Sequence, residues 1–558
     1  MSAQAQATTG HGTAADSRRW WALAVIAIAQ LMIVLDITIV NIALPSAQKD
    51  LGISDADRQW VITAYTLAFG GLLLLGGRLG DLFGRKRVFI IGLLGFALAS
   101  AIGGSASGPT MLFAARALQG AFGALLAPSA LGLLSTTFSD PRERSTAFGI
   151  FGAIAGGGAA IGLLLGGVLT EYLNWRWCLF VNTPIAVAAA FAAYSVLTRD
   201  HIGKGTRIRL DLPGALLGCG GLLAIVFGMS EAVTRGWADA LVLGSLVFGV
   251  LLLAVFVLVE KRTPHALLPT HIVANRNRGG GALSIGLAMI GMFGLFLFLT
   301  YYLQVIKHFS PVMSGVSFLP MTAAIVISST GFAARLMTRV PSRNLIGPGL
   351  LLAASGMAWL TQMRVDSPWA GMVLPAELLL GFGMGLVFMP SMSLATLGVA
   401  PHEAGAASAT INSAQQVGGS FGTALLNTIA ASATASWLAA RGLGAANPAV
   451  RAEGSVHGYV VATWVAMGIL LVAALIAFLM INHRPAPGEA TGTGEAAGTT
   501  GAAEVTGATE VTGATEVAGA TGTAGAVGAA GGPAEAEAGA RAPQSPAQSP
   551  AHQRQRAR

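Results

Sequence analysis

Charged residues are scarce in this chain of 558 residues, since Asp, Glu, Lys and Arg together make up only 10% of it. Soluble proteins carry about 25% charged residues, so the composition excludes an ordinary soluble protein. Hydrophobic residues make up 54% of the chain and form continuous runs, unlike the short alternating segments of a transmembrane β-barrel. The composition therefore predicts an all-α polytopic membrane protein.

Cysteine is nearly absent, and the sequence motifs of several enzyme classes are missing. The only two cysteines, Cys178 and Cys219, lie in apolar segments, so we expect no disulfide framework and no metal site. No GxxxxGK[ST] or HExxH motif is present, so neither ATP nor a cofactor is expected to drive the protein. An ion gradient remains as the expected energy source. The net charge of +8 lies in short loops, where topology explains it better than nucleic acid does.

Apolar segments long enough to cross a bilayer recur along the chain, because about 20 apolar residues suffice for one crossing. Together they predict fourteen transmembrane helices, at approximately 20–44, 60–79, 88–107, 109–133, 146–170, 177–197, 211–230, 240–259, 280–303, 312–334, 345–363, 369–397, 404–430 and 457–482. With the N-terminus inside, the cytoplasmic loops hold more Lys and Arg than the outer loops. We therefore expect both termini in the cytoplasm, with the chain in the cytoplasmic membrane of a bacterium.

The C-terminal segment 485–558 differs from the rest of the chain. It is rich in Gly, Ala, Thr and Glu, and it contains tandem hexapeptides beginning at Glu504, Glu510 and Glu516. Such a composition cannot bury enough apolar surface to offset the entropy lost on ordering. This segment is therefore predicted to be a disordered cytoplasmic tail.

Two ionisable residues lie inside predicted transmembrane helices. Asp36 is the only charged residue between Trp20 and Pro45, and Arg116 lies well within the fourth span. A charge at the bilayer centre costs about 2.5–3.5 kcal/mol on insertion scales, so such residues are candidate functional sites. Asp36 is a candidate for binding a proton or a cationic substrate, with a structural ion pair as the alternative. Arg116 must be paired or hydrated, because arginine does not give up its proton in proteins.

The loop after the second span reads GRLGDLFGRKR, from Gly77 to Arg87. This stretch resembles the G-x-L-a-D-r-x-G-r-k signature of the major facilitator superfamily. Three other stretches are similar to elements of its fourteen-span drug:proton antiporters: LDITIVNIALP at 35–45, RALQG at 116–120, and NWRW with NTP at 174–184. In the fifth span, Leu163 stands where the antiporter signature has proline, although the glycine ridge from Gly158 to Gly167 is kept.

The resemblance implies the major facilitator fold: two six-helix bundles that rock about a central cavity, with two extra helices between them. The expected parts are an N-terminal tail (1–19), a first bundle (20–197), a linker with the two extra helices (198–279), a second bundle (280–484) and the tail (485–558). The resemblance also implies that Asp36 and Arg116 act in proton coupling. It assigns the loop motif to gating, and the candidate gating residues are Gly77, Asp81, Gly84, Arg85 and Lys86.

Polar and aromatic residues in other spans are candidates for lining a substrate cavity between the two repeats, where transporters of this kind bind substrate. Packing between helices is the alternative for each of them. For Glu377 the alternatives are a second proton site and a place near the extracellular interface. The candidates are Asn41, Gln119, Phe293, Glu377, Asn412, Gln415 and Gln416.

The sequence thus predicts a protein that is not an enzyme but a proton-coupled antiporter exporting hydrophobic or cationic small molecules, such as drugs or antibiotics. Its expected partners are the substrate, protons and the lipid bilayer, and we expect it to act as a monomer. One alternative keeps the fold but makes the cargo one endogenous metabolite, exported or imported. Another is a polytopic membrane enzyme or sensor, although no catalytic cluster or folded soluble domain is visible in the sequence.

Overall fold

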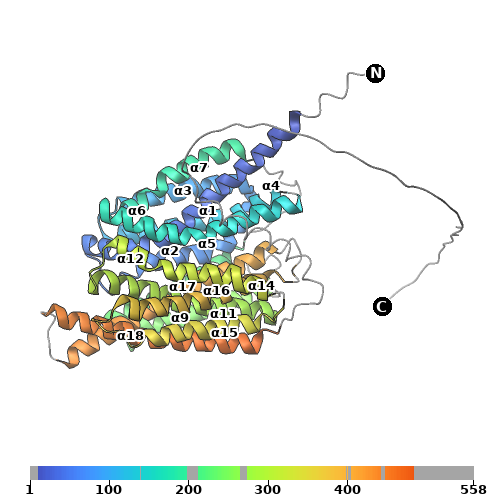
Figure 1. Cartoon of the computed structure of the whole chain (residues 1–558). Coiled ribbons are helices and arrows are strands. Elements are labelled where there is room, and N and C mark those ends of the chain that lie inside the picture. The colour runs from blue at the N-terminus through green and yellow to red at the C-terminus, as the bar shows by residue number, and fades with distance from the viewer. Residues whose placement is uncertain are drawn as a thin grey trace, which may run out of the picture. The chain divides into compact units, whose positions relative to one another are not determined.

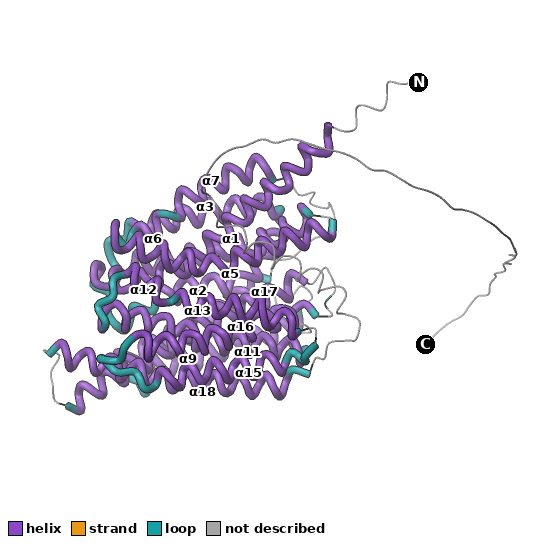
Figure 2. The backbone as a smooth tube through the Cα atoms, viewed as in Figure 1, coloured by secondary structure: helices purple, strands orange, loops and turns teal. Residues whose placement is uncertain are grey.

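The computed structural model describes residues 10–138, 140–197, 211–263, 273–337, 339–397, 399, 404–441 and 447–482. All regular secondary structure in these ranges is helical (Figure 2). The predicted tail 485–558 lies outside the described residues, as do residues 1–9. The boundaries predicted between the five parts of the chain stay predictions.

The first group of helices covers the range predicted as the first bundle. It consists of α1 (Gly10–Leu51), α2 (Trp60–Phe83), α3 (Arg85–Gly104), α4 (Pro109–Thr137), α5 (Pro141–Tyr172), α6 (Trp177–Phe180) and α7 (Asn182–Val196). Helix α4 packs on α2 and α3, while α1 packs on α5 and α7. In Figure 1, α1, α3 and α7 lie together on one side of the bundle.

The second group covers the range predicted as the second bundle. It consists of α11 (Arg276–Tyr301), η1 (Tyr302–Ile306), α12 (Pro311–Ser317), α13 (Leu319–Val326), η2 (Ile327–Ala333), α14 (Ala334–Leu336), α15 (Arg343–Leu360), η3 (Trp369–Val373), α16 (Leu374–Thr396), α17 (Ala404–Ala440) and α18 (Pro448–Met480). The η elements are π-helical turns that continue neighbouring α-helices. Helix α16 packs on α13, η2 and α15, and α11 packs on α17 and α18.

Two further helices, α8 (Leu212–Arg235) and α9 (Ala240–Arg262), form a hairpin. Asp211 and Asp239 cap their N-termini by accepting hydrogen bonds from the backbone N–H groups of Gly214 and Leu241. Helix α8 packs on α2 of the first group and on α17 of the second. The inserted hairpin therefore contacts both groups.

Each of the fourteen predicted spans falls on helical structure. Among the described residues, eleven helices are long and apolar enough to cross a membrane. The helices α5, α15 and α17, with 32, 18 and 37 residues, cover the other three predicted spans, and the part of α5 from Gly157 to Tyr172 is also apolar. The structure is thus that of a multi-pass membrane protein with about eleven to fourteen apolar helices.

The two groups meet mainly through α2 against α17 and through α5 against α12. The contact of α5 uses the glycine ridge noted in the sequence. A Cβ atom at Gly166 would lie 3.0 Å from the backbone of Ile39 in α1, and one at Gly167 would lie 2.7 Å from Val312 in α12. The close packing expected from these glycines is present, although Leu163 replaces the proline and α5 runs without a break.

Candidate functional site

Asp36 and Arg116 form an ion pair in the interior of the first group. The Nη1 atom of Arg116 lies 2.6 Å from Oδ2 of Asp36. Asp36 is 0% exposed and Arg116 is 1% exposed. Two charges at such depth are tolerated only when each is paired and its remaining polar atoms are hydrogen-bonded.

Further hydrogen bonds satisfy both charged groups. Oδ1 of Asp36 accepts from Nδ2 of Asn182 at 2.8 Å and from Nε2 of Gln119 at 3.0 Å. Arg116 donates through Nη1 to Oε1 of Gln119 at 2.9 Å and through Nε to the carbonyl oxygen of Val61 at 2.9 Å. The two charged residues and the two amides therefore form one connected network, which we call the Asp36 network.

Two other buried side chains surround this network. Gln119 also donates to Oγ of Ser100 at 2.8 Å, and Cζ of Arg116 lies 4.4 Å from the ring centroid of Tyr65. Together with Val61, Tyr65 and Ser100, which contact it directly, the Asp36 network draws on α1, α2, α3, α4 and α7. A proton arriving at Asp36 would cancel the charge that holds Arg116, so five helices would sense the protonation of one carboxylate.

The local sequence explains how α4 can approach α2 so closely. Arg116 and Gln119 are three residues apart, so they share one face of α4. Gly120, the next residue, faces the backbone of Tyr65, and a Cβ atom there would overlap the carbonyl oxygen of Tyr65. The glycine in the stretch RALQG thus lets α2 and α4 touch, which places Arg116 beside Val61.

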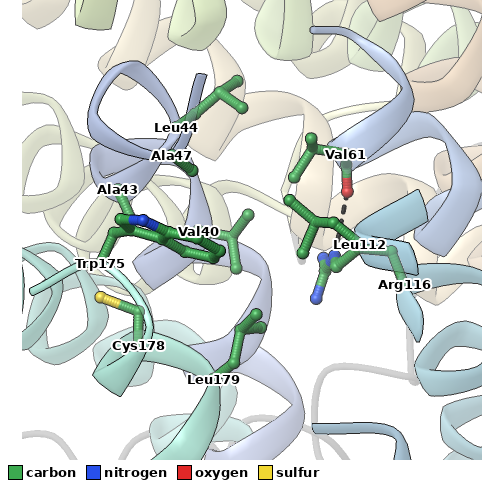
Figure 3. Close-up of a pocket in the computed structure, with 10 residues that line it drawn as sticks. All are labelled: Val40, Ala43, Leu44, Ala47, Val61, Leu112, Arg116, Trp175, Cys178 and Leu179. Carbon is green, nitrogen blue, oxygen red and sulfur yellow. Dashed lines mark hydrogen bonds between the residues drawn. The ribbon is translucent and has the colours of Figure 1, made fainter. Parts of the chain in front are cut away.

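A small cavity of about 10 Å³ lies next to Arg116 (Figure 3). It is below the 300–1,000 Å³ that is usual for small-molecule sites. Apart from Arg116, its lining is apolar; it consists of Val40, Ala43, Leu44, Ala47, Val61, Leu112, Trp175, Cys178 and Leu179. In this conformation the cavity borders the Asp36 network, but it is too small for a drug-sized molecule.

The structure separates the substrate-cavity candidates of the first group. Gln119 lies within the Asp36 network. Asn41 is buried and does not join that network: its Nδ2 atom donates to the carbonyl oxygen of Ile37 in the same helix at 2.8 Å. Spacing along α1 thus puts Asn41 near Asp36 without bringing their side chains together.

Among the substrate-cavity candidates of the second group, three lie on α17 and Phe293 lies against α17, whereas Glu377 lies on α16. Asn412, Gln415 and Gln416 on α17 are half-buried, and Gln416 lies against α2 at Gly70. Phe293 is half-buried against Gly419 of α17. Glu377 is 0% exposed and stands in the first turn of α16.

The gating candidates lie on both sides of the turn between α2 and α3. Gly84 has φ 90°, in the left-handed region that favours glycine. Arg85 donates to the carbonyl oxygen of Gly132 in α4 at 3.0 Å, and Lys86 donates to that of Tyr194 in α7 at 2.7 Å. A Cβ atom at Gly77 would lie 3.6 Å from Pro128.

In the described contacts, Arg85 and Lys86 thus bind the ends of α4 and α7 within the first group. The side chain of Asp81 lies outside the described part of the chain.

A second polar cluster joins the two groups at the opposite end of α2, and sequence reasoning missed it. Arg58, in the turn before α2, donates to Oδ1 of Asn427 in α17 at 3.0 Å and stacks on Tyr301 of α11 at 4.0 Å. Nδ2 of Asn427 donates back to the carbonyl oxygen of Asp55 at 3.2 Å. We call Arg58, Asn427, Tyr301 and Asp55 the Arg58 cluster, and this end of the bundle the Arg58 end.

More contacts between the groups lie at or toward the Arg58 end. Tyr301 also donates to Gln48 of α1. Gln304 donates to the carbonyl oxygen of Ile42 at 2.9 Å, and the backbone N–H of Val312 donates to Glu171 at 2.9 Å. The two groups are therefore fastened together at this end.

The sequence contained partial signals for these residues. Asn182 stands in the NTP stretch inside an apolar segment, where a lone amide indicates a buried partner. Arg58 carries no comparable signal, because it looks like any charged residue of a loop.

The fold and the Asp36 network define a class of protein, the multi-pass helical membrane transporters. A model of the Major Facilitator Superfamily matches residues 26–423, and the chain belongs to this family. It is therefore a transporter and not an enzyme.

Relatives with names support this assignment. The chain is 57% identical to the puromycin resistance protein pur8 of Streptomyces alboniger, over 86% of this chain and 94% of that one. It is 40% identical to the cephamycin export protein CmcT of Amycolatopsis lactamdurans, over 76% and 87% of the two chains. Among solved structures, an auto-inhibited POT family peptide transporter matches with a TM-score of 0.61 at 17% identity, over 84% of this chain and 99% of that one. That structural likeness shows the fold alone.

Proposed function

We propose that the protein is a proton-coupled antiporter that exports antibiotic-like small molecules, hydrophobic or cationic, across the bacterial cytoplasmic membrane. Its relatives include proteins named for resistance to puromycin and for the export of cephamycin. The single observation that carries the coupling mechanism is the fully buried Asp36–Arg116 pair, 2.6 Å apart and enclosed by hydrogen-bonding amides.

The proposed topology has fourteen transmembrane helices in a monomer with both termini in the cytoplasm. The concentration of Arg85, Lys86 and Arg87 at one turn supports this orientation, because basic residues favour cytoplasmic loops. The Arg58 end then faces the outside. Since the two groups are fastened there, the conformation corresponds to one that is closed to the outside.

The proposed cycle uses the two protonation states of Asp36. In the ionised state Asp36 holds Arg116, Gln119 and Asn182, as the distances support. A proton that enters from the outside neutralises Asp36 and weakens its hold on Arg116, so the five helices of the network can rearrange. Release of that proton toward the cytoplasm restores the pair, and drug leaves in the opposite direction.

The proton gradient is sufficient for this work, and no cofactor is needed. One charge that moves through about 100 mV gains about 2.3 kcal/mol. A tenfold concentration gradient of a neutral solute costs about 1.4 kcal/mol. One proton in each cycle therefore supports useful extrusion.

Everted membrane vesicles test the proposal. Respiration acidifies the lumen of such vesicles, and addition of puromycin to vesicles with the wild-type protein should release protons from it. Asp36→Asn should abolish this release, whereas Asp366→Asn, at an exposed loop residue, should leave it unchanged.

Wild-type exchange by the Asp36→Asn protein would refute the role of Asp36. A panel of unrelated antibiotics in the same assay separates a drug exporter from a carrier dedicated to one compound.

A further inference from the structure

Glu377 differs from Asp36 in having no hydrogen-bond partner. It lies near the start of α16 and is 0% exposed. Neither Oε1 nor Oε2 accepts or donates a hydrogen bond to any described residue. Asp36, at the same degree of burial, receives hydrogen bonds from three side chains. The carboxyl groups of Glu377 and Asp36 thus have opposite surroundings.

The elements that pack on α16 offer no positive charge near Glu377. Helix α13, the η2 and η3 turns and helix α17 contain no ionisable residue within their bounds. The only charged residue of α15 is Arg343, which begins that helix. Gly356 is the residue of α15 that lies against Ala376. It follows Arg343 by 13 residues, so Arg343 is roughly 20 Å away along the axis of α15.

Helix α11 also keeps its charges away from Glu377. Arg276 and Arg278 are in its first turn, and Tyr301, its one other titratable residue, is engaged with Arg58 and Gln48. A buried carboxylate without a partner or a nearby cation is strongly disfavoured relative to its neutral form. The surroundings of Glu377 in this conformation therefore favour its neutral, protonated form over the carboxylate.

Close backbone packing seals the proton in. Gly381 and Gly385 follow Glu377 by one and two turns on the same face of α16. A Cβ atom at Gly381 would overlap the carbonyl oxygen of Met321 in α13. A Cβ atom at Gly385 would lie 2.7 Å from Cβ of Ser328 in η2. On another side, a Cβ atom at Gly356 would lie 2.8 Å from the carbonyl oxygen of Ala376. Water has no room at this face unless α16 separates from α13.

The position of α16 connects Glu377 to the motion of the two groups. Helix α16 packs on α13, η2 and α15 much as α4, which carries Arg116, packs on α2 and α3. Helix α12, which leads directly into α13, touches the first group, since Gly315 lies against Leu163 of α5. The contact between the groups is therefore connected through α12 to α13, which packs on α16.

We propose that Glu377 is a second proton-binding site, which takes up a proton from outside water when the two groups separate at the Arg58 end, keeps it while that end is closed, and gives it up toward the cytoplasm later in the cycle. Uptake converts a carboxylate and one free proton to a carboxylic acid, and release reverses that step. It rests on the proposed antiport function and adds a second proton, held in the second group, to the one at Asp36.

Infrared spectroscopy of the purified full-length protein tests the protonation without any transport. The wild-type protein should show the carbonyl absorption of a buried protonated carboxylic acid at neutral pH. Glu377→Gln should lose it, whereas Asp36→Asn and the exposed-site control Glu453→Gln should keep it. Because this measurement needs no substrate, it remains valid even if proton-driven transport of puromycin fails.

Reconstituted proteoliposomes then test the coupling, with puromycin as the probe. Glu377→Gln should still exchange puromycin but should release about one proton fewer for each molecule, whereas Glu453→Gln should match the wild type. Absence of the infrared band from the wild-type protein would overturn the proposal, and so would an unchanged proton count in Glu377→Gln. Loss of binding of cationic but not neutral probes, with the proton count unchanged, would instead make Glu377 a substrate-binding residue.

The wild-type protein supplies a further check that does not depend on the folding of any variant. In detergent, where the two groups can separate, raising the pH should remove the infrared band of Glu377 reversibly. A band that persists in alkaline buffer while the protein remains folded and still exchanges puromycin would overturn the proposed proton exchange between Glu377 and water.

Discussion

Arg58 lies with its guanidinium carbon 4.0 Å from the ring centroid of Tyr301, so the turn between α1 and α2 is held against the end of α11. Arg58 is only 5% exposed although it lies in a turn, and its Nε atom donates to Asn427 at 3.0 Å. Burial alone would lower its pKa, but Tyr459, Tyr301 and Asp55 outweigh that effect and raise the pKa of Arg58 above its usual value. The contact between the groups therefore stays charged at every physiological pH.

Replacement of Arg58 by Gln should loosen this end of the bundle. A hydrogen bond to a charged group contributes about 1.5–3 kcal/mol, and each 1.4 kcal/mol is a tenfold change in an equilibrium. We expect alkylation of a cysteine placed at Ser420, on the interface with α2, to become tenfold or more faster, in a background with Cys178 and Cys219 replaced. Arg451→Gln, at an exposed residue of α18, is the control. Equal alkylation rates in both variants would show that Arg58 does not hold the groups together.

Gly120→Ala should damage the protein although it adds only one methyl group. The new Cβ atom would overlap the carbonyl oxygen of Tyr65, so α4 and Arg116 would have to move away from α2. Overpacking of this kind costs about 1–3 kcal/mol or more. We expect a lower midpoint of thermal unfolding in detergent and a loss of drug-driven proton release. Gly468→Ala, where a Cβ atom meets no atom within 4 Å, should behave as the wild type; equal effects at both glycines would contradict the close approach of α2 and α4.

Asn182→Leu tests whether the Asp36 network depends on α7. The variant removes one of the amide donors to Asp36, a contribution of about 1.5–3 kcal/mol for a hydrogen bond to a charged group. Both the thermal midpoint and the rate of proton release should fall. Asn41→Leu is the matched control, because Asn41 donates to its own helix and not to Asp36. If Asn41→Leu were as harmful as Asn182→Leu, Asn41 would belong to the Asp36 network, contrary to the structure.

The sequence was sufficient for the helices and for the two charged residues of the network, because each of these signals is local. An apolar run of spanning length is helical wherever it occurs in lipid, and a charge inside such a run is costly whatever its neighbours are. The partners of those charges are not local properties. Asn182 and Asn41 look equally suitable in the sequence, and only the rotation of α7 and α1 about their axes decides which one meets Asp36.

Arg58 could not be recognised for a related reason. Its burial comes from α11, α17 and α18, which lie more than 200 residues away in the chain. Loop motifs with several unusual residues, such as the turn around Gly84, were easier to find. The backbone at Gly84 has a positive φ angle, which favours glycine, so the sequence itself shows the requirement. A single arginine beside a span carries no such mark.

Ser230 fastens the inserted hairpin to the first group. Its hydroxyl oxygen accepts from Nε2 of Gln59 at 2.8 Å and from Nε1 of Trp60 at 2.9 Å, while the neighbouring carbonyl oxygen of Met229 accepts from Thr428 of α17 at 2.9 Å. One turn of α8 therefore holds both groups at the Arg58 end. The extra helices thus act as a strap across the interface in this conformation.

Ser230→Ala should weaken the contact between the inserted hairpin and the first group. The substitution leaves the donors of Gln59 and Trp60 without their acceptor, at a cost of about 1–3 kcal/mol for a buried donor. We expect a lower thermal midpoint and faster alkylation of a cysteine at Ser420. Ser245→Ala in α9 is the control, because among the described residues that hydroxyl bonds only to the carbonyl oxygen of Val242 in its own helix. If Ser230→Ala and Ser245→Ala gave the same midpoint and the same alkylation rate, the hairpin would not help to hold the two groups together at this end. Closure would then depend on the Arg58 cluster and on the direct contacts between the groups.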